Sequence, residues 1–164
     1  MPVSAETIRQ HLDYSAWASQ RLVDEALKLT PDELRRDFQT SDRSVLDTLV
    51  HVYAADRIWL ARVKGEHRDT FVDPADRDMD VLVTEWPALH QRWKRYAQNL
   101  SDQDVLANIS YKDTKGNAWS NSLWQILLHL VNHGTHHRGQ VAGFLRSMGH
   151  PPPALDLIVY YRTY

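Results

Sequence analysis

The sequence predicts an all-α protein, namely a four-helix bundle with a small β-hairpin before the last long helix. Three observations lead to this prediction. Four long segments show the apolar spacing of helices, one long connection separates two of them, and a short alternating stretch contains a glycine-bearing turn. The chain of 164 residues is the size of one domain, so we expect a single domain over residues 1–164.

The first two long helices have recognisable ends. Apolar residues at helical spacing predict the first from about residue 4 to residue 29. Thr30 then supplies an N-cap before Pro31 and Glu33, which predicts the start of a short new helix. The second long helix is predicted over residues 44–64, where Ser44 opens it and Gly65 closes it.

The third long helix begins near residue 73 and continues to Leu100. Pro87 lies inside this pattern, so either the helix is kinked there or the helix proper begins around Trp86. Ser101 either ends the helix or caps a following turn.

The remaining chain predicts a hairpin, a fourth long helix and a short apolar tail. Residues 108–119 alternate and contain Gly116, as a small β-hairpin would. The last long helix is predicted over residues 122–148, with Ser122 and Gln125 as a capping pair and Gly149 as its stop. Residues 155–161 are apolar, and we expect them to pack against the bundle or against a second subunit.

Composition excludes several classes of function. A formal net charge of −2 gives no basic field for nucleic acid, so we expect no nucleic-acid partner. The chain has no cysteine, so thiol chemistry needs a thiol from a partner or cosubstrate. No apolar stretch reaches transmembrane length and no signal peptide precedes the first helix, which predicts a cytoplasmic protein without a membrane partner.

Four of the nine histidines fall within residues 129–137 of the last helix. A helix advances about 100° per residue, so with His133 at zero the apolar face spans roughly +20° to +120°. His137 falls inside that arc at about +40° and His133 borders it, whereas His129 and His136 lie at about −40° and −60°. The last helix therefore ranks His137 and His133 first as inward-facing ligands, His129 next and His136 last.

An H-x-x-x-H pair places two imidazoles on one face, which suits a divalent metal ion. Two ligands are not enough, and His51 in the second long helix is the obvious third. Its helical face holds Thr48, Ala55 and Ile58 instead of the strongest aliphatic stripe, so periodicity alone does not select it. The alternative is that each histidine is a packed, hydrogen-bonded core side chain, the commoner fate of a single buried histidine.

The motifs also resemble a known family. The run from Leu128 through H-x-x-H-H-R-G-Q to Val141, the second-helix pattern around His51 with Trp59, and the first-helix pattern Y-x-x-W-A are similar to the DinB/YfiT-like family of metal-binding helix bundles. The resemblance covers nearly the whole chain and implies that family's four-helix fold. This family is unrelated to the lesion-bypass DNA polymerase of similar name.

The resemblance implies a divalent metal bound by His51, His133 and His137, in agreement with the ranking on the last helix. Zinc or nickel is the first expectation, with manganese or iron as alternatives, because neutral imidazole accommodates all of them. The chain departs from the family pattern at Ser15 and Ser19, where many members carry asparagine. Arg138 lies about 140° from His133 and is expected to tie helices or subunits together.

Three neutral ligands leave a metal ion its full charge and an open position, as in catalytic zinc sites. Together with the resemblance, this predicts a metal-dependent S-transferase that adds a low-molecular-weight thiol to an electrophilic small molecule. No catalytic residue beyond the metal ligands is assigned. Two alternatives stay open, namely a metal-dependent hydrolase and a noncatalytic metal-binding stress protein.

The second long helix also predicts an assembly. It is apolar on most of its circumference, with Leu46, Leu49 and Leu60 on one side and Ala55 and Ile58 on another. Since one bundle core should not bury both sides fully, we expect a homodimer that forms through the long helices.

Overall fold

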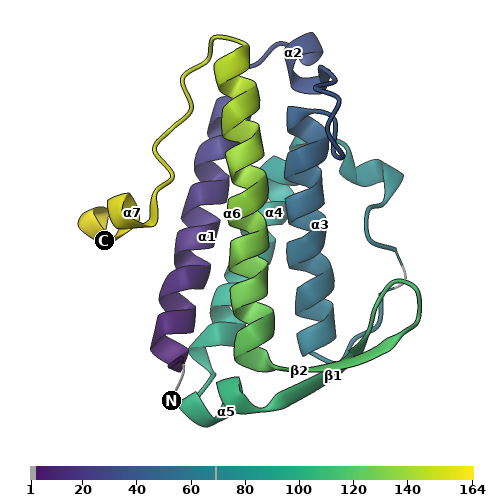
Figure 1. The fold of residues 1–164 in the computed structure, drawn as a ribbon, viewed down its shortest axis with the longest axis vertical. Helices are drawn as coiled ribbons and strands as arrows, with labels where there is room; N and C mark the ends of the chain where they lie inside the picture. The colour runs from purple at the N-terminus through teal and green to yellow at the C-terminus, as the bar shows by residue number, and fades with distance from the viewer. Residues whose placement is uncertain (1–2, 69) are drawn as a thin grey trace.

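The computed structural model describes residues 3–68 and 70–164 and shows a bundle of four long helices (Figure 1). Within these ranges, no helix combines the length and the apolar character that a membrane span needs. The predicted fold class is confirmed. The four long helices are α1 (Ala5–Ala26), α3 (Val45–Val63), α4 (Met79–Gln98) and α6 (Leu123–Ser147).

Each long helix packs against two neighbours. Helix α6 lies between α1 and α3, and α4 closes the ring by packing against the same two helices (Figure 1). Helices α1 and α6 run in one direction and α3 and α4 in the other, because the connection from α3 to α4, described over residues 64–68 and 70–78, runs back along the bundle (Figure 1). The long connection expected from the sequence is therefore the crossover between α3 and α4.

Capping residues set the helix starts as the sequence indicates. Thr30 and Glu33 form a reciprocal capping box at the short helix α2 (Pro31–Arg35). Ser44 accepts a hydrogen bond from the Asp47 backbone at the start of α3. Ser101 caps the short helix α5 (Asp102–Leu106). Of the two roles expected for Ser101, it therefore caps the following turn and does not end α4.

The structure excludes one of the two interpretations of the segment around Pro87. Helix α4 begins at Met79 with Asp78 as its N-cap, and Pro87 lies within it, so the helix does not start around Trp86. The chain before it forms only the short 3-10 turn η1 (Pro74–Asp76). Burial of Leu82 and Trp86 on the same face stabilises the turns on both sides of the proline despite its missing N–H.

The hairpin and the tail complete the fold. Strands β1 (Asn108–Lys112) and β2 (Ala118–Ser122) pair antiparallel, with Tyr111 opposite Trp119. The tail folds into α7 (Leu157–Thr163), where Tyr160 contacts the rings of Tyr14 and Trp17 on α1. The tail therefore packs on its own bundle, which is one of the two outcomes expected from its apolar sequence.

The apolar sides of α3 are all buried within one chain. Leu46, Leu49 and Leu60 are at most 1% exposed, and Ala55 and Ile58 on the other side are at most 3% exposed. The bundle achieves this because α1, α4 and α6 surround α3 on several sides. The reason for expecting a homodimer from α3 is therefore removed, and the homodimer itself stays a prediction.

One carboxylate is buried in the core beside two tryptophans. Asp56 of α3 is 6% exposed and accepts a hydrogen bond of 2.7 Å from the Trp86 indole N–H. Its backbone carbonyl accepts a second bond, 3.0 Å long, from the Trp93 indole. His90 Nε2 lies 3.4 Å from the same carboxylate. These contacts join α3 to α4 through satisfied polar groups.

We expect Asp56→Ala to lower the free energy of unfolding by about 2 to 3 kcal/mol, because it leaves the buried Trp86 N–H without an acceptor. Urea denaturation measures this loss. In a Trp86→Phe background the same substitution should cost about 1 kcal/mol less, because the donor is already gone. An equal cost in both backgrounds would show that the Trp86 bond contributes nothing.

Candidate metal centre

The three predicted ligands come from the two helices that pack side by side at the centre of the molecule. His51 lies in the middle of α3, and His133 and His137 lie one turn apart in the middle of α6. Because α3 packs directly on α6, the imidazoles of both helices meet at their interface. The structure therefore brings together all three residues that the sequence selects.

The ligand atoms are close enough for one ion. One nitrogen from each of the three side chains lies within 4.8 Å of the others. His51 Nε2 and His133 Nε2 are 3.0 Å apart, close to the about 3.3 Å that tetrahedral geometry with bonds of about 2.0 to 2.1 Å requires. The ring centre of His137 lies 4.4 Å from the ring centre of His51 and 4.5 Å from that of His133. The three histidines could hold a metal ion.

Hydrogen bonding orients the ring of His137. Its Nδ1 is 2.7 Å from the side-chain oxygen of Gln140, one turn further along α6. An amide oxygen only accepts, so Nδ1 carries the proton and Nε2 keeps its lone pair. The glutamine of the H-R-G-Q motif thus selects the tautomer that can bind a metal through Nε2.

Asp42 is a candidate site residue that the sequence analysis missed. Its two carboxylate oxygens lie 3.4 Å from His51 Nδ1 and 3.3 Å from His137 Nδ1, so one carboxylate spans ligands from both helices. This arrangement of a carboxylate behind metal-binding imidazoles orients the rings and strengthens them as ligands. Asp42 precedes α3 in an irregular loop, where periodicity carries no information.

The loop that carries Asp42 is held to α6 by an aromatic stack. Phe38 stacks on Phe144 with ring centres 4.2 Å apart and planes within 5°. The backbone N–H of Phe38 donates to the carbonyl of Arg43 and closes the loop. Gln39 and Arg43 adopt φ values of 58° and 63°, which non-glycine residues rarely do. Packing therefore imposes the unusual backbone that places Asp42 over the histidines.

Burial keeps two of the imidazoles neutral. Burial, together with repulsion from His137 and His51, lowers the pKa of His133 to about 4. Burial also lowers the pKa of His51, although Asp42 opposes that shift. Neutral imidazole is the form that binds metal, so neither ring has to lose a proton at neutral pH.

The donor set fits a cation. The protonated Nδ1 of His137 leaves its Nε2 lone pair free, and Asp42 favours the same tautomer in His51, whose Nε2 faces His133. Within the described ranges, His133 Nδ1 is buried with no hydrogen-bond partner. One proton can lie between the two nitrogens of the short His51–His133 contact, whereas a metal ion would satisfy a lone pair on each of the three rings.

The other two histidines of the last helix lie outside the cluster, as their angles indicate. His136 is exposed and touches only the edge of the His137 ring, with ring centres 4.8 Å apart. His129 is also exposed, with its ring centre 5.9 Å from that of His133 and 5.6 Å from that of Trp59. Neither contributes a nitrogen to the metal-sized group of described residues.

Arg138 ties α6 to α1 instead of touching the histidines. It is 1% exposed, and its guanidinium donates to the hydroxyls of Ser15 and Ser19 and to that of Thr135. Burial lowers the pKa of Arg138 accordingly. The two serines that depart from the family pattern are therefore bound to Arg138, and their polar groups serve the α1–α6 interface.

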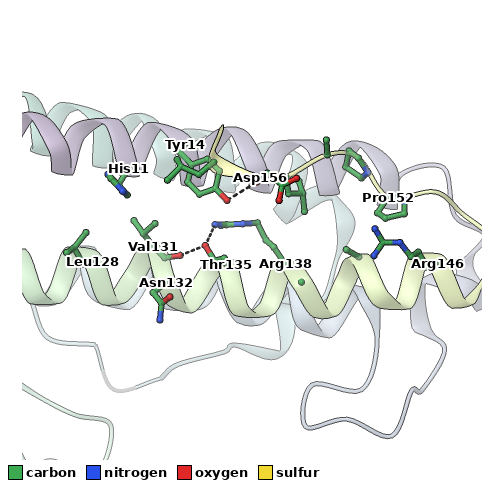
Figure 2. Close-up of a pocket in the computed structure, with 16 residues that line it drawn as sticks. His11, Tyr14, Leu128, Val131, Asn132, Thr135, Arg138, Arg146, Pro152 and Asp156 are labelled. Atoms are coloured by element: carbon green, nitrogen blue, oxygen red, sulfur yellow. Dashed lines mark hydrogen bonds between the residues drawn. The ribbon is translucent and has the colours of Figure 1, made fainter. Parts of the chain in front are cut away.

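A large cavity lies away from the histidines. It has a volume of about 860 Å³ and separates α1 and α6 from the C-terminal segment, where Tyr14 donates a hydrogen bond to the Leu155 carbonyl (Figure 2). His11, Thr135 and Arg138 line it, and none of the three candidate ligands does. Two smaller hollows adjoin the histidines, one of about 250 Å³ at His51 and one of about 260 Å³ at His129.

Comparison with known proteins identifies relatives over nearly the whole chain. A family model described as the DinB family matches residues 1–163. Protein DinB of Bacillus subtilis strain 168 is 24% identical over 154 residues, which is 90% of each chain. The crystal structure of a DinB-like protein from Bacillus cereus ATCC 10987 superposes with a TM-score of 0.71 and 19% identity, covering 94% of this chain and 99% of that one.

We expect His51→Ala, His133→Ala and His137→Ala each to abolish stoichiometric zinc binding, because each removes one of three converging ligands. His136→Ala should bind zinc as the unchanged protein does, since its side chain lies outside the cluster. Elemental analysis of dialysed, untagged protein measures the zinc content. If the His133 and His137 variants both retain one tightly bound ion, the assignment is wrong, and a normal His51 variant would make His129 the next candidate.

We expect Asp42→Asn to weaken zinc binding by about 10- to 100-fold without abolishing it, because the ligands remain but lose the carboxylate behind them. Titration against a competing chelator gives the affinity. Asp47→Asn is the matched control, since Asp47 lines the same hollow but contacts Ser44 and Arg77 instead of a histidine. Equal affinities for the two variants would leave Asp42 without a role in the site.

Proposed function

Because the chain belongs to the DinB family, we propose that His51, His133 and His137 hold a divalent metal ion and that the site is a small-thiol-dependent S-transferase. The observation that carries the proposal is the make-up of the cluster. Three imidazoles converge, and no carboxylate belongs to the metal-sized group found among the described residues. A closed structural site would have four protein ligands.

A divalent ion with three neutral ligands keeps its charge and an open position, and when bound it lowers the pKa of a thiol or water that enters that position. We propose zinc or nickel, with manganese or iron as the alternatives. The chain has no cysteine, so the thiol has to be a cosubstrate. We therefore propose that the site needs a bound metal ion for activity and that the small thiol is the nucleophile of the reaction.

The chain's own residues prepare the site in two ways. Gln140 and Asp42 contact Nδ1 of His137, and Asp42 also contacts Nδ1 of His51, which leaves Nε2 of both rings to bind the ion. Burial, together with repulsion from the neighbouring histidines, lowers the pKa of His133 to about 4 and keeps that ring neutral. The geometry is thus formed before any ligand arrives, which reduces the free energy that binding has to supply.

The hollow at His51 supports a polar thiol as cosubstrate. It has a volume of about 250 Å³ and is lined by charged residues of both signs, namely Asp42, Asp47, Arg43 and Arg77. A small thiol that carries both an ammonium and a carboxylate group can pair with such a surface. The hollow also contains His51 itself, so a thiol bound there lies beside the cluster.

We expect the zinc- or nickel-loaded protein to conjugate a small thiol such as cysteine or glutathione to an electrophile. The turnover should disappear on chelation and return when metal is restored. His136→Ala should stay active, whereas His51→Ala should be inactive. Product formation measured by mass spectrometry across a panel of electrophiles tests this.

Cobalt-loaded protein gives an independent readout, because a sulfur ligand adds a charge-transfer band that the His51→Ala variant should lack. Hydrolysis of ester or amide substrates without any thiol conjugation would favour a metal-dependent hydrolase. A large loss of thermal stability on chelation, with neither activity, would favour a noncatalytic metal-binding stress protein.

A further inference from the structure

An aromatic pocket adjoins the histidine cluster on the side away from Asp42. Its walls come from three elements, with Trp59 on α3, Tyr111 on β1 and His129 on α6. The ring of Trp59 contacts both of the others edge to face, with centres 5.0 Å from Tyr111 and 5.6 Å from His129. The hairpin thus places Tyr111 beside the rings at the ends of α3 and α6 and completes the aromatic pocket.

His129 connects this pocket to the candidate metal centre. It lines the pocket, and its ring centre lies 5.9 Å from that of His133, one helical turn away. Trp59 lies two turns after His51 on the neighbouring helix. A molecule in the pocket is therefore within a side-chain length of the cluster, on the opposite side from the charged hollow.

The walls of the pocket are fixed by their own contacts. The Arg62 guanidinium lies 4.6 Å from the Trp59 ring centre and 5.5 Å from that of Tyr111, so one cation contacts both rings. The Tyr111 hydroxyl donates to the side-chain oxygen of Asn121, whose amide in turn donates to Gln125. Rings held in this way can bind a flat ligand without first becoming ordered.

The lining selects the chemistry of the ligand. Aromatic walls favour a flat ring that can stack or meet them edge to face. The hydrogen bonds of the described residues use the Gln125 side-chain oxygen but leave its amide nitrogen available to an oxygen acceptor on a ligand. The volume of about 260 Å³ is below the about 300 to 1,000 Å³ of drug-sized pockets, so it suits one ring system.

We propose that the Trp59–Tyr111–His129 pocket binds the electrophile, and that this electrophile is a single-ring aromatic compound bearing an oxygen acceptor, such as a nitroarene or a quinone. The inference rests on the proposed S-transferase function, in which the charged hollow at His51 takes the thiol. The two hollows lie on either side of the histidines, so each substrate approaches the cluster from its own side.

The reaction balances for the probe 1-chloro-2,4-dinitrobenzene without an oxidant or reductant. The thiol loses its proton to solvent, and its sulfur forms a bond to the ring carbon that carries chlorine. The carbon–chlorine bond breaks, and chloride leaves with the electron pair. The nitro oxygens, which take up the negative charge of the addition step, are the acceptors that the Gln125 amide can reach.

The first test measures binding alone, with 1,3-dinitrobenzene as an unreactive probe. Saturable quenching of tryptophan fluorescence and isothermal titration calorimetry both report its affinity. We expect Trp59→Leu and Tyr111→Leu each to raise the dissociation constant by about tenfold, because each removes an aromatic wall. Trp119→Leu is the matched control on the same hairpin, since Trp119 is 55% exposed and lies outside the pocket.

The use of two pocket variants keeps the test informative even if one of them does not fold. Tyr111 lies on the hairpin and is only partly buried against the core, so we expect its variant to keep the circular dichroism spectrum and the zinc content of the unchanged protein even if Trp59→Leu does not. An unchanged affinity in a folded Tyr111→Leu, or equal weakening by Trp119→Leu, would overturn the pocket assignment. Absence of saturable binding to the unchanged protein would do the same.

The second test separates this inference from the proposed function. In steady-state kinetics with 1-chloro-2,4-dinitrobenzene, we expect Tyr111→Leu to raise the KM for the electrophile and to leave the KM for the thiol unchanged. A raised KM for the thiol alone would mean that the pocket holds the thiol, and it would overturn the assignment. If no thiol is conjugated although the probe binds as expected, the S-transferase proposal fails while the aromatic site stands.

Discussion

The packing of α6 between α1 and α3 is the constraint on which both the bundle and the site depend. His137 and Arg138 are consecutive residues about 100° apart on this helix, so they enter different interfaces. His137 meets α3 and the loop before it, and Arg138 meets α1. A rotation of α6 would therefore disrupt the histidine cluster and the α1 contacts together, which couples the geometry of the site to the packing of the core.

The α1–α6 interface also explains how a charge is tolerated inside the bundle. Arg138 is almost fully buried, and the groups that accept its hydrogen bonds are neutral, namely the hydroxyls of two serines and a threonine and the backbone carbonyl of Ser15. Gly134 allows this, because a Cβ at that position would lie 2.6 Å from the guanidinium. Gly134 on α6 and the two serines on α1 are thus all needed to accommodate the same buried guanidinium.

The candidate site combines a rigid part with two surfaces of different chemistry. Asp42 and Gln140 orient the imidazoles, and a loop with two left-handed residues is held in place by the stack of Phe38 on Phe144. One side of the cluster is lined by charges of both signs, and the other by aromatic rings. Under the proposed S-transferase function, the charged surface would receive the polar thiol and the aromatic surface the electrophile.

Much of the fold follows from local signals in the sequence. Apolar periodicity located the four long helices, and caps such as Thr30 and Ser44 set where two of the helices begin, because each acts within a few residues. The spacing of His133 and His137 likewise selected a helical pair by local geometry alone. Pro87 was harder to interpret, because the burial of neighbouring side chains against other helices decides whether a helix continues through a proline.

Other features depended on the tertiary structure, because they join residues that are distant in the chain. Asp42 spans His51 and His137 only because α3 packs on α6, and the aromatic pocket exists only where the hairpin folds over those helices. Leu49 and Ile58 lie on different sides of α3 and are both buried by other helices of the same chain, which no pattern within α3 could show. Sequence periodicity determines which face of a helix is buried, whereas tertiary packing determines which residues that face meets.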